Sequence, residues 1–212
     1  MSRIAVIGGT GYAGSHIVAE AVARGHDVIS VSRHLPTEPV EGAAYVEGPI
    51  LGVPALLEEI GDVDVVIQAL SPRGDMAGKV RPATAELFAA LPPHARLGVV
   101  GGAGGSLVSA GGPRVIDAGF PEEFVAEATE AIGVLEDLQA DDSGKDWFFV
   151  HPAGSFGAWN PGERTGSYRD GGPVLVVDGT GESFISGADL GVAFVDEIEN
   201  PQHSRENFAV GY

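Results

Sequence analysis

Short runs of apolar residues alternate along the chain with longer segments in which apolar residues recur at helical spacing. Continuous apolar runs are typical of strands buried on both faces, and helical spacing is typical of helices with one buried side. The pattern predicts strands at residues 4–7, 27–33, 43–47, 64–70, 96–100 and 147–150, and helices at 15–23, 54–60, 82–91, 121–139 and 188–199. This alternation predicts an α/β fold built on a doubly wound parallel sheet.

The C-terminal third departs from this alternation. Residues 157–172 are rich in Gly, Arg and aromatic residues and predict an irregular lobe, and a short strand is expected at 175–177. A final edge strand is expected at 208–210. The chain has 212 residues, of which 44% are hydrophobic, so one sizeable core is possible. We expect a single domain, 1–212, with residues 152–186 contributing most of a small lobe.

A glycine-rich turn joins the first predicted strand to the first predicted helix. It reads Gly8-Gly9-Thr10-Gly11-Tyr12-Ala13-Gly14 and contains G-x-G-x-x-G. Glycines in this context let backbone N–H groups approach a pyrophosphate at a helix N-terminus, whereas the alternative is a tight turn without a ligand. The motif predicts dinucleotide binding by Gly8, Thr10, Gly11, Tyr12, Ala13 and Gly14.

The end of the second predicted strand bears on the choice of nucleotide. An NAD site usually has an acidic residue there for the ribose 2′-hydroxyl, but this chain has Ser32 and Arg33. A guanidinium favours a 2′-phosphate through charge-assisted hydrogen bonds. The pair therefore predicts NADP(H) in preference to NAD(H), the alternative being a surface arginine without a ligand.

Three further strand ends are expected beside the nicotinamide, because ligands of doubly wound sheets bind at the carboxyl ends of the strands. The glycine-rich turn after residues 96–100 predicts backbone packed against a ligand, or else a flexible turn. Residues 73–81 are expected to form a mobile loop nearby. The candidate cofactor-binding residues at these ends are Ala69, Leu70, Ser71, Gly101, Gly102, Pro152 and Phe156.

Composition excludes several kinds of partner and chemistry. The chain has 12 Lys and Arg against 30 Asp and Glu, a formal net charge of −18, which argues against nucleic-acid and anionic-membrane binding. It contains no cysteine, and its six histidines show no metal-ligand spacing, so no metal site is expected. No signal region or membrane-length apolar run is seen, so a cytoplasmic location is expected.

Several segments together resemble the atypical short-chain dehydrogenase/reductases. The narrower resemblance is to NADH-flavin reductase-like NAD(P)H-binding proteins, relatives of the NmrA-like and biliverdin-reductase-B-like proteins. It is carried by residues 6–14, 24–28, 99–104, 106–107, 120–121, 162–166 and 168–169, Trp147, Val150, Pro152, Ile185, Ser186 and Asp189. The resemblance implies a Rossmann-type domain with a small C-terminal substrate lobe. It also implies hydride transfer from a nicotinamide to a flavin-like or quinone-like small-molecule acceptor.

The chain departs from this family pattern at the catalytic positions. The usual Tyr-x-x-x-Lys pair is missing, and Phe124 and Ala128 occupy its expected place. Ser106, preceded by an extra Gly105, is a candidate for a hydrogen bond to the nicotinamide or the acceptor, or else a turn serine. His151 ends a strand and is a candidate proton donor near neutral pH, or else a structural histidine.

Two function classes stay open from the sequence. The first is an NADPH-dependent reductase, for which a flavin or quinone needs no proton donor such as the absent pair. The second is a non-catalytic NADP(H)-binding redox sensor of the NmrA-like type. An open pocket walled by Phe156, Trp159 and residues 73–81 would favour the reductase. Both a monomer and a dimer remain possible, and Arg164 and Tyr168 are expected either to close over an acceptor or to fix the lobe.

Overall fold

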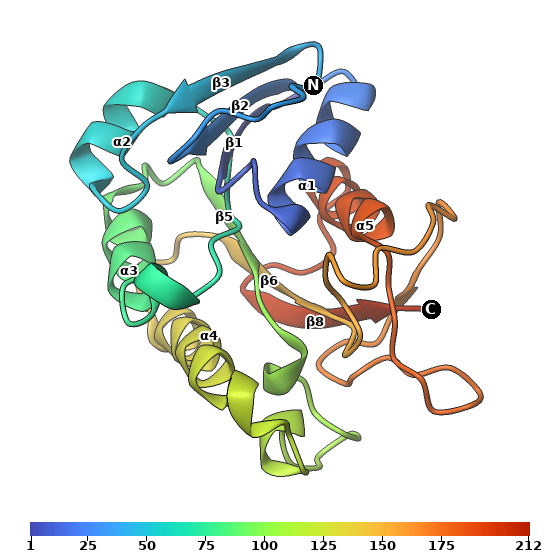
Figure 1. Ribbon diagram of the computed structural model, residues 1–212. Helices are drawn as coiled ribbons and strands as arrows, with labels where there is room; N and C mark the ends of the chain where they lie inside the picture. The colour runs from blue at the N-terminus through green and yellow to red at the C-terminus, as the bar shows by residue number, and fades with distance from the viewer.

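The computed structural model describes all residues, 1–212, and contains one eight-stranded sheet flanked by five helices (Figure 1). The strand order is β3-β2-β1-β4-β5-β6-β8-β7, and every pair is parallel except the antiparallel pair β7 and β8. The strands are β1 Arg3–Ile7, β2 Asp27–Ser32, β3 Ala43–Glu47, β4 Val65–Gln68, β5 Arg96–Val100, β6 Trp147–Pro152, β7 Arg169–Asp170 and β8 Glu206–Gly211. The helices are α1 Tyr12–Ala23, α2 Val53–Ile60, α3 Val80–Ala90, α4 Glu122–Ala140 and α5 Gly187–Glu199. The predicted Rossmann-type α/β fold is confirmed.

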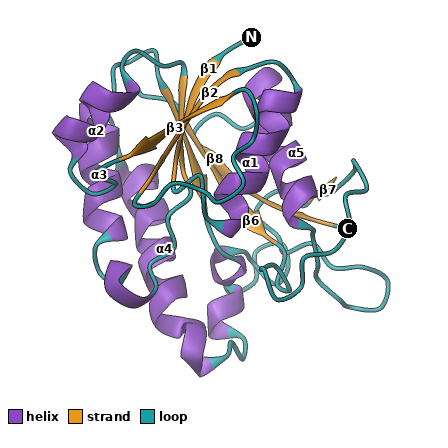
Figure 2. Cartoon of the chain, turned by 45° about the horizontal axis from the view of Figure 1, so that its top comes forward, coloured by secondary structure: helices purple, strands orange, loops and turns teal.

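The helices divide between the two faces of the sheet. Figures 1 and 2 show α2, α3 and α4 along one face and α1 with α5 along the other. Strand β1 is apolar from Ile4 to Ile7 because both of its faces are covered. Ile4 and Val6 lie in the core cluster beneath α1 and α5, whereas Ala5 and Ile7 lie in the cluster beneath α2, α3 and α4. Successive side chains of a strand point to opposite faces, so both sets are buried, at about 1.5–3 kcal/mol for each large aliphatic side chain.

The C-terminal part differs from the prediction in two places. Residues 175–177 do not form a strand, because the backbone pairing with Leu107 is confined to Pro173, Val174 and Leu175 and does not continue along the segment. The last strand, β8, is longer than predicted and is not at the edge, since β7 pairs with its outer side. The lobe is thus joined to the main sheet.

Residues 73–81 are more ordered than a loop. Gly74–Met76 form a 3₁₀ turn, and α3 begins at Val80. The Glu130 carboxylate of α4 accepts hydrogen bonds from the backbone N–H groups of Gly78, Val80 and Arg81 at 2.6, 2.8 and 3.0 Å. Helix α4 therefore fixes the start of α3.

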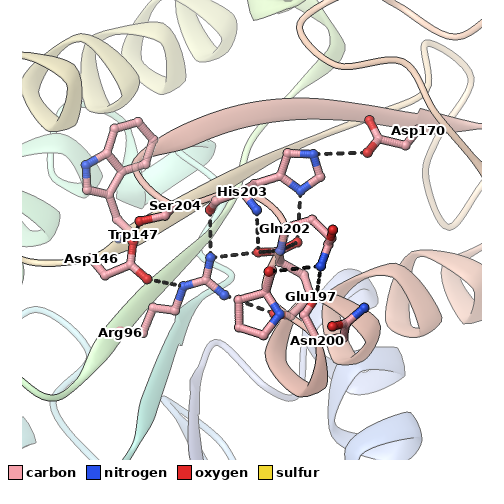
Figure 3. A network of polar contacts seen from close by, with 10 residues as sticks. Arg96, Asp146, Trp147, Asp170, Glu197, Asn200, Gln202, His203 and Ser204 are labelled. Carbon is pink, nitrogen blue, oxygen red and sulfur yellow. Dashed lines mark hydrogen bonds and ion pairs between the residues drawn. The ribbon is translucent and has the colours of Figure 1, made fainter.

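A buried polar network lies at the amino end of the sheet, where β5 begins (Figure 3). The Arg96 guanidinium is 2.7 Å from Glu197 and 2.7 Å from Asp146, and it lies over the ring of Phe148. Burial acts to raise the pKa of Glu197, but the hydrogen bonds from Arg96 and His203 outweigh it and keep that pKa below its usual range. The network joins β5 to the end of α5, opposite the carboxyl ends of the strands.

Candidate functional site

A single large cavity of about 870 Å³ lies at the carboxyl ends of the parallel strands. Its walls come from the glycine turn after β1, the residues after β2, β4, β5 and β6, and one side of α4. This volume is within the range of about 300–1,000 Å³ for small-molecule and cofactor sites. Of the fifteen cofactor-binding residues expected from the sequence, fourteen line it: Gly8, Thr10, Gly11, Tyr12, Ala13, Ser32, Arg33, Ala69, Leu70, Ser71, Gly101, Gly102, Pro152 and Phe156.

Three glycines of the turn have different structural roles. Gly8 has a φ of +85°, which disfavours any residue with a Cβ. A Cβ on Gly14 would lie 2.3 Å from the carbonyl oxygen of Gly8, so this glycine, which does not line the cavity, permits the close packing of helix and turn. Gly11 caps α1 without any side-chain hydrogen bond. The first N–H groups of α1 are therefore free to bind an anion at the positive end of the helix.

Ser32 and Arg33 have different positions at the end of β2. Ser32 is almost fully buried, and its hydroxyl accepts a hydrogen bond of 3.1 Å from the backbone of Thr10, which fixes the glycine turn. The Arg33 side chain is about half exposed, lines the cavity and forms an ion pair with Asp75. No acidic residue occupies the end of this strand.

Gly101 and Gly102 form the cavity wall after β5. A Cβ on Gly101 would lie 2.0 Å from the ring of Phe149, so the backbone can lie against that ring only as glycine. A Cβ on Gly102 would meet no atom within 4 Å, so this residue contributes bare backbone to the cavity. The turn therefore presents peptide groups rather than side chains to a ligand.

Ser106 and His151, the two catalytic candidates, do not line the cavity. Ser106 is fully buried, and its hydroxyl has no hydrogen-bond partner. His151 is 1% exposed, with Nδ1 at 2.8 Å from the carbonyl oxygen of Gly102 and Nε2 at 3.2 Å from Nδ2 of Asn207. Burial lowers the pKa of His151 to about 4. A neutral ring with both nitrogens occupied supports the glycine turn and does not favour direct proton donation.

Gly105 also has a structural explanation. A Cβ at this position would lie 2.6 Å from Cε1 of His151. The extra glycine seen in the sequence thus makes room for the buried imidazole. The next residue, Ser106, is fully buried and does not line the cavity.

Glu127 and Arg73 are cavity residues that the sequence pattern did not single out. The Glu127 carboxylate accepts a hydrogen bond of 3.0 Å from the hydroxyl of Ser71 and pairs with Arg73. A signal was present, because Phe124, Glu127, Ala128 and Ala131 recur at helical spacing and all line the cavity. That face of α4 includes the positions where the missing Tyr–Lys pair would lie.

Residues of the lobe also line the cavity. Phe156 and Trp159 form one wall, and Trp159 is 72% exposed, so this end opens to solvent. Arg73, Met76 and Phe124 lie among the other residues around the same cavity.

Arg164 and Tyr168 lie outside the cavity and contact the helices below the lobe. Arg164 forms an ion pair with Glu20 of α1, and Tyr168 packs against the core cluster beneath α1 and α5, near the carboxylate of Asp196. Burial, reinforced by the Asp196 charge, raises the pKa of Tyr168 above its ordinary value. Their positions favour the structural alternative, in which they fix the lobe to the sheet.

The Tyr12 hydroxyl forms a second tie between the lobe and the glycine turn. It donates to the carbonyl oxygen of Pro161 at 3.3 Å and accepts from the backbone of Gly187 at 3.2 Å. Tyr12 also lines the cavity and packs its ring against that of Phe156. One residue thus contacts the cavity, the lobe and the start of α5.

Two other classes of site are not seen. The chain has no group of three or more His, Asp or Glu side chains that could hold a metal ion. None of its helices combines the length and apolarity needed to cross a bilayer.

Comparisons with known proteins agree with this geometry. A family model described as NAD(P)H-binding matches residues 8–201. The uncharacterized protein YwnB of Bacillus subtilis (strain 168) is 36% identical over 212 residues, covering 98% of this chain and 97% of its own. A structure from Streptococcus pneumoniae TIGR4, described as "a putative NADH-flavin reductase", is 30% identical with a TM-score of 0.85 and covers 100% of this chain and 99% of its own.

A second similar structure carries a different description. The "putative epimerase" of Bacteroides thetaiotaomicron is 32% identical with a TM-score of 0.86, over 99% of this chain and 96% of its own. The resemblance to the atypical short-chain dehydrogenase/reductases, and to their NADH-flavin reductase-like NAD(P)H-binding members, is thereby confirmed. The chain belongs to the NAD(P)H-binding family.

Proposed function

We propose that the protein is an NADPH-dependent reductase that transfers hydride directly to a flat acceptor of the flavin or quinone class. The observation that carries this proposal is the shape of the cavity. It runs from the glycine turn, past the ends of β4 and β5, to an open end beside Phe156 and Trp159. A second planar molecule can stack there against the nicotinamide position.

The residues of the cavity fit a bound dinucleotide. The uncapped start of α1 and the bare backbone at Gly11 suit a pyrophosphate, and Arg33 suits a 2′-phosphate. When bound, the reduced nicotinamide supplies a hydride, which is two electrons and one hydrogen nucleus, and leaves as the oxidised form. The acceptor completes its reduction with one proton.

The chain itself supplies orientation and charge at the acceptor end. The Ser71 hydroxyl donates a hydrogen bond to Glu127, so its oxygen is left to accept a hydrogen bond from the nicotinamide carboxamide N–H. Arg73 lines the same cavity and can balance negative charge on the acceptor after hydride transfer. The proton comes from solvent, because the open end beside Trp159 admits water.

The alternative is a non-catalytic NADP(H)-binding sensor. It is favoured by the absence of the Tyr–Lys pair from the residues that line the cavity. Tyr12 is the only tyrosine among the lining residues, no lysine lines the cavity, and His151 is enclosed behind the Gly102 turn. A sensor would bind the nucleotide and use the open end for a partner rather than an acceptor.

Stopped-flow oxidation of NADPH with a panel of free flavins and quinones separates these functions. Turnover with at least one acceptor supports the reductase, whereas tight NADPH binding without turnover supports the sensor. Gly11→Val is the matched control, because its side chain would occupy the pyrophosphate position and should abolish both binding and turnover. Unchanged NADPH binding by Gly11→Val would reject the assignment of the cavity.

A further inference from the structure

Arg33 is paired across the mouth of the cavity with a residue from a distant segment. Its partner Asp75 belongs to the 3₁₀ turn Gly74–Met76, which follows β4, whereas Arg33 follows β2. Strand β1, with the glycine turn at its end, lies between β2 and β4 in the sheet. The ion pair therefore bridges the two sides of the crevice in which the adenosine half of a dinucleotide would lie.

The backbone that carries Asp75 is held independently of Arg33. The neighbouring Met76 is 5% exposed and packs into the core cluster beneath α3, and Glu130 binds the N–H groups just beyond it. The Asp75 side chain is itself 68% exposed and has no other hydrogen-bond partner. Its carboxylate can therefore rotate away from Arg33 without any movement of the backbone.

We infer that Asp75 competes with the 2′-phosphate of NADPH for Arg33 and so sets how strongly the protein prefers NADPH over NADH. This inference rests on the proposed nucleotide site. A 2′-phosphate carries up to two negative charges at neutral pH, so it repels a carboxylate on the same guanidinium. The ribose of NADH has an uncharged 2′-hydroxyl, which leaves the pair between Arg33 and Asp75 intact.

The competition is modest because both side chains are exposed. An exposed ion pair changes an equilibrium by up to about fivefold, and a bidentate guanidinium–phosphate contact is stronger than that. NADPH therefore displaces Asp75, but with lower affinity than Arg33 alone would give. Removing the Asp75 charge also removes its repulsion of the phosphate, which further increases the affinity for NADPH.

The test is the substitution Asp75→Asn, which keeps the side-chain size and removes its charge. Binding of NADPH and NADH to the full chain is followed by isothermal titration calorimetry. We expect the Kd for NADPH to fall by about three- to tenfold and the Kd for NADH to change by less than about twofold. The gain for NADPH should shrink as salt is added, since screening weakens charge competition.

Glu86→Gln is the matched control. Glu86 is an exposed acid of α3 that lies outside the cavity, so its removal changes the net charge equally without touching Arg33. Three outcomes would each overturn the inference. They are an equal gain in NADPH affinity for Glu86→Gln, an equal gain in affinity for both nucleotides in Asp75→Asn, and weaker NADPH binding by Asp75→Asn.

The double variant Arg33→Ala, Asp75→Asn separates this inference from the proposed function. With Arg33 absent, the added Asp75→Asn change should alter the Kd for NADPH by less than about twofold, because nothing remains to compete for. A wild-type chain that binds neither nucleotide rejects the proposed function and the inference together. Binding that depends on Arg33 but not on Asp75 rejects the inference alone.

Discussion

Because His151 is buried and neutral, we expect the protein to lose stability against unfolding in acid. Its pKa is lowered by burial to about 4, whereas an unfolded histidine titrates near 6.5. Protonation at Nε2 would set two donors against each other, because that nitrogen accepts from Nδ2 of Asn207. Below pH 6.5 the His151 ring therefore binds a proton in the unfolded chain, whereas in the folded chain it binds that proton only near pH 4.

The magnitude follows from the difference between the two pKa values. One pKa unit corresponds to about 1.4 kcal/mol, so the neutral His151 contributes at most about 3 kcal/mol to the free energy of unfolding. This contribution is present above pH 6.5 and is lost as the pH falls toward 4. Between pH 7 and pH 5 the expected loss in unfolding free energy from this residue is about 2 kcal/mol.

Urea unfolding at pH 7, 6 and 5 measures this loss in the wild type and in His151→Gln. The variant lacks the titrating ring, so its stability should fall by about 2 kcal/mol less than that of the wild type over the same pH range. His94→Gln is the control, because the His94 side chain is 56% exposed. Equal pH dependence of the wild type and His151→Gln would refute the burial argument and restore His151 as a candidate proton donor.

Three other substitutions test the site. Arg33→Ala should weaken NADPH by about 10- to 100-fold through loss of charge-assisted hydrogen bonds, while NADH weakens by less than about threefold; equal weakening in calorimetry would contradict the 2′-phosphate role. Glu127→Gln should slow NADPH oxidation by about two- to tenfold with little change in NADPH affinity, because the negative charge that pairs with Arg73 and strengthens the hydrogen bond from Ser71 is removed. An unchanged rate would contradict a role for Glu127 in the reaction. Ser106→Ala should keep the turnover rate within about twofold of the wild type. It should raise the unfolding free energy by about 1–3 kcal/mol, because an unpaired buried hydroxyl is removed. A large loss of turnover would return Ser106 to the catalytic residues.

The strands and the glycine turn could be predicted because local sequence determines them. Strand β1 is buried on both faces and is therefore apolar at every position from Ile4 to Ile7. The glycines of the turn are required by a positive φ at Gly8 and by close packing at Gly14. The segment 175–177 has similar composition, but strand formation also needs a neighbouring strand, which the fold does not provide there.

The roles of individual polar residues depend on tertiary contacts that the sequence does not display. His151 is placed like a catalytic residue at a strand end, yet the space left by Gly105 buries its ring. Glu127 reads as a surface acid of α4, yet it meets Ser71, which lies 56 residues earlier in the chain. Arg33 could be predicted to lie at the cavity, whereas its pairing with Asp75 arises only when two loops meet.

The packing of α1 against α5 supports one side of the cavity from behind. A Cβ on Gly187 would lie 2.1 Å from the ring of His16, and one on Gly191 would lie 2.7 Å from the carbonyl oxygen of the same residue. A side chain at either glycine would force these two helices apart, and Tyr12 fastens the lobe to them. Across the crevice, Gly74 and Gly78 have positive φ and nothing within 4 Å of their Cβ directions. Gly78 is nevertheless held by its hydrogen bond to Glu130, so both sides of the cavity are supported by residues that do not line it.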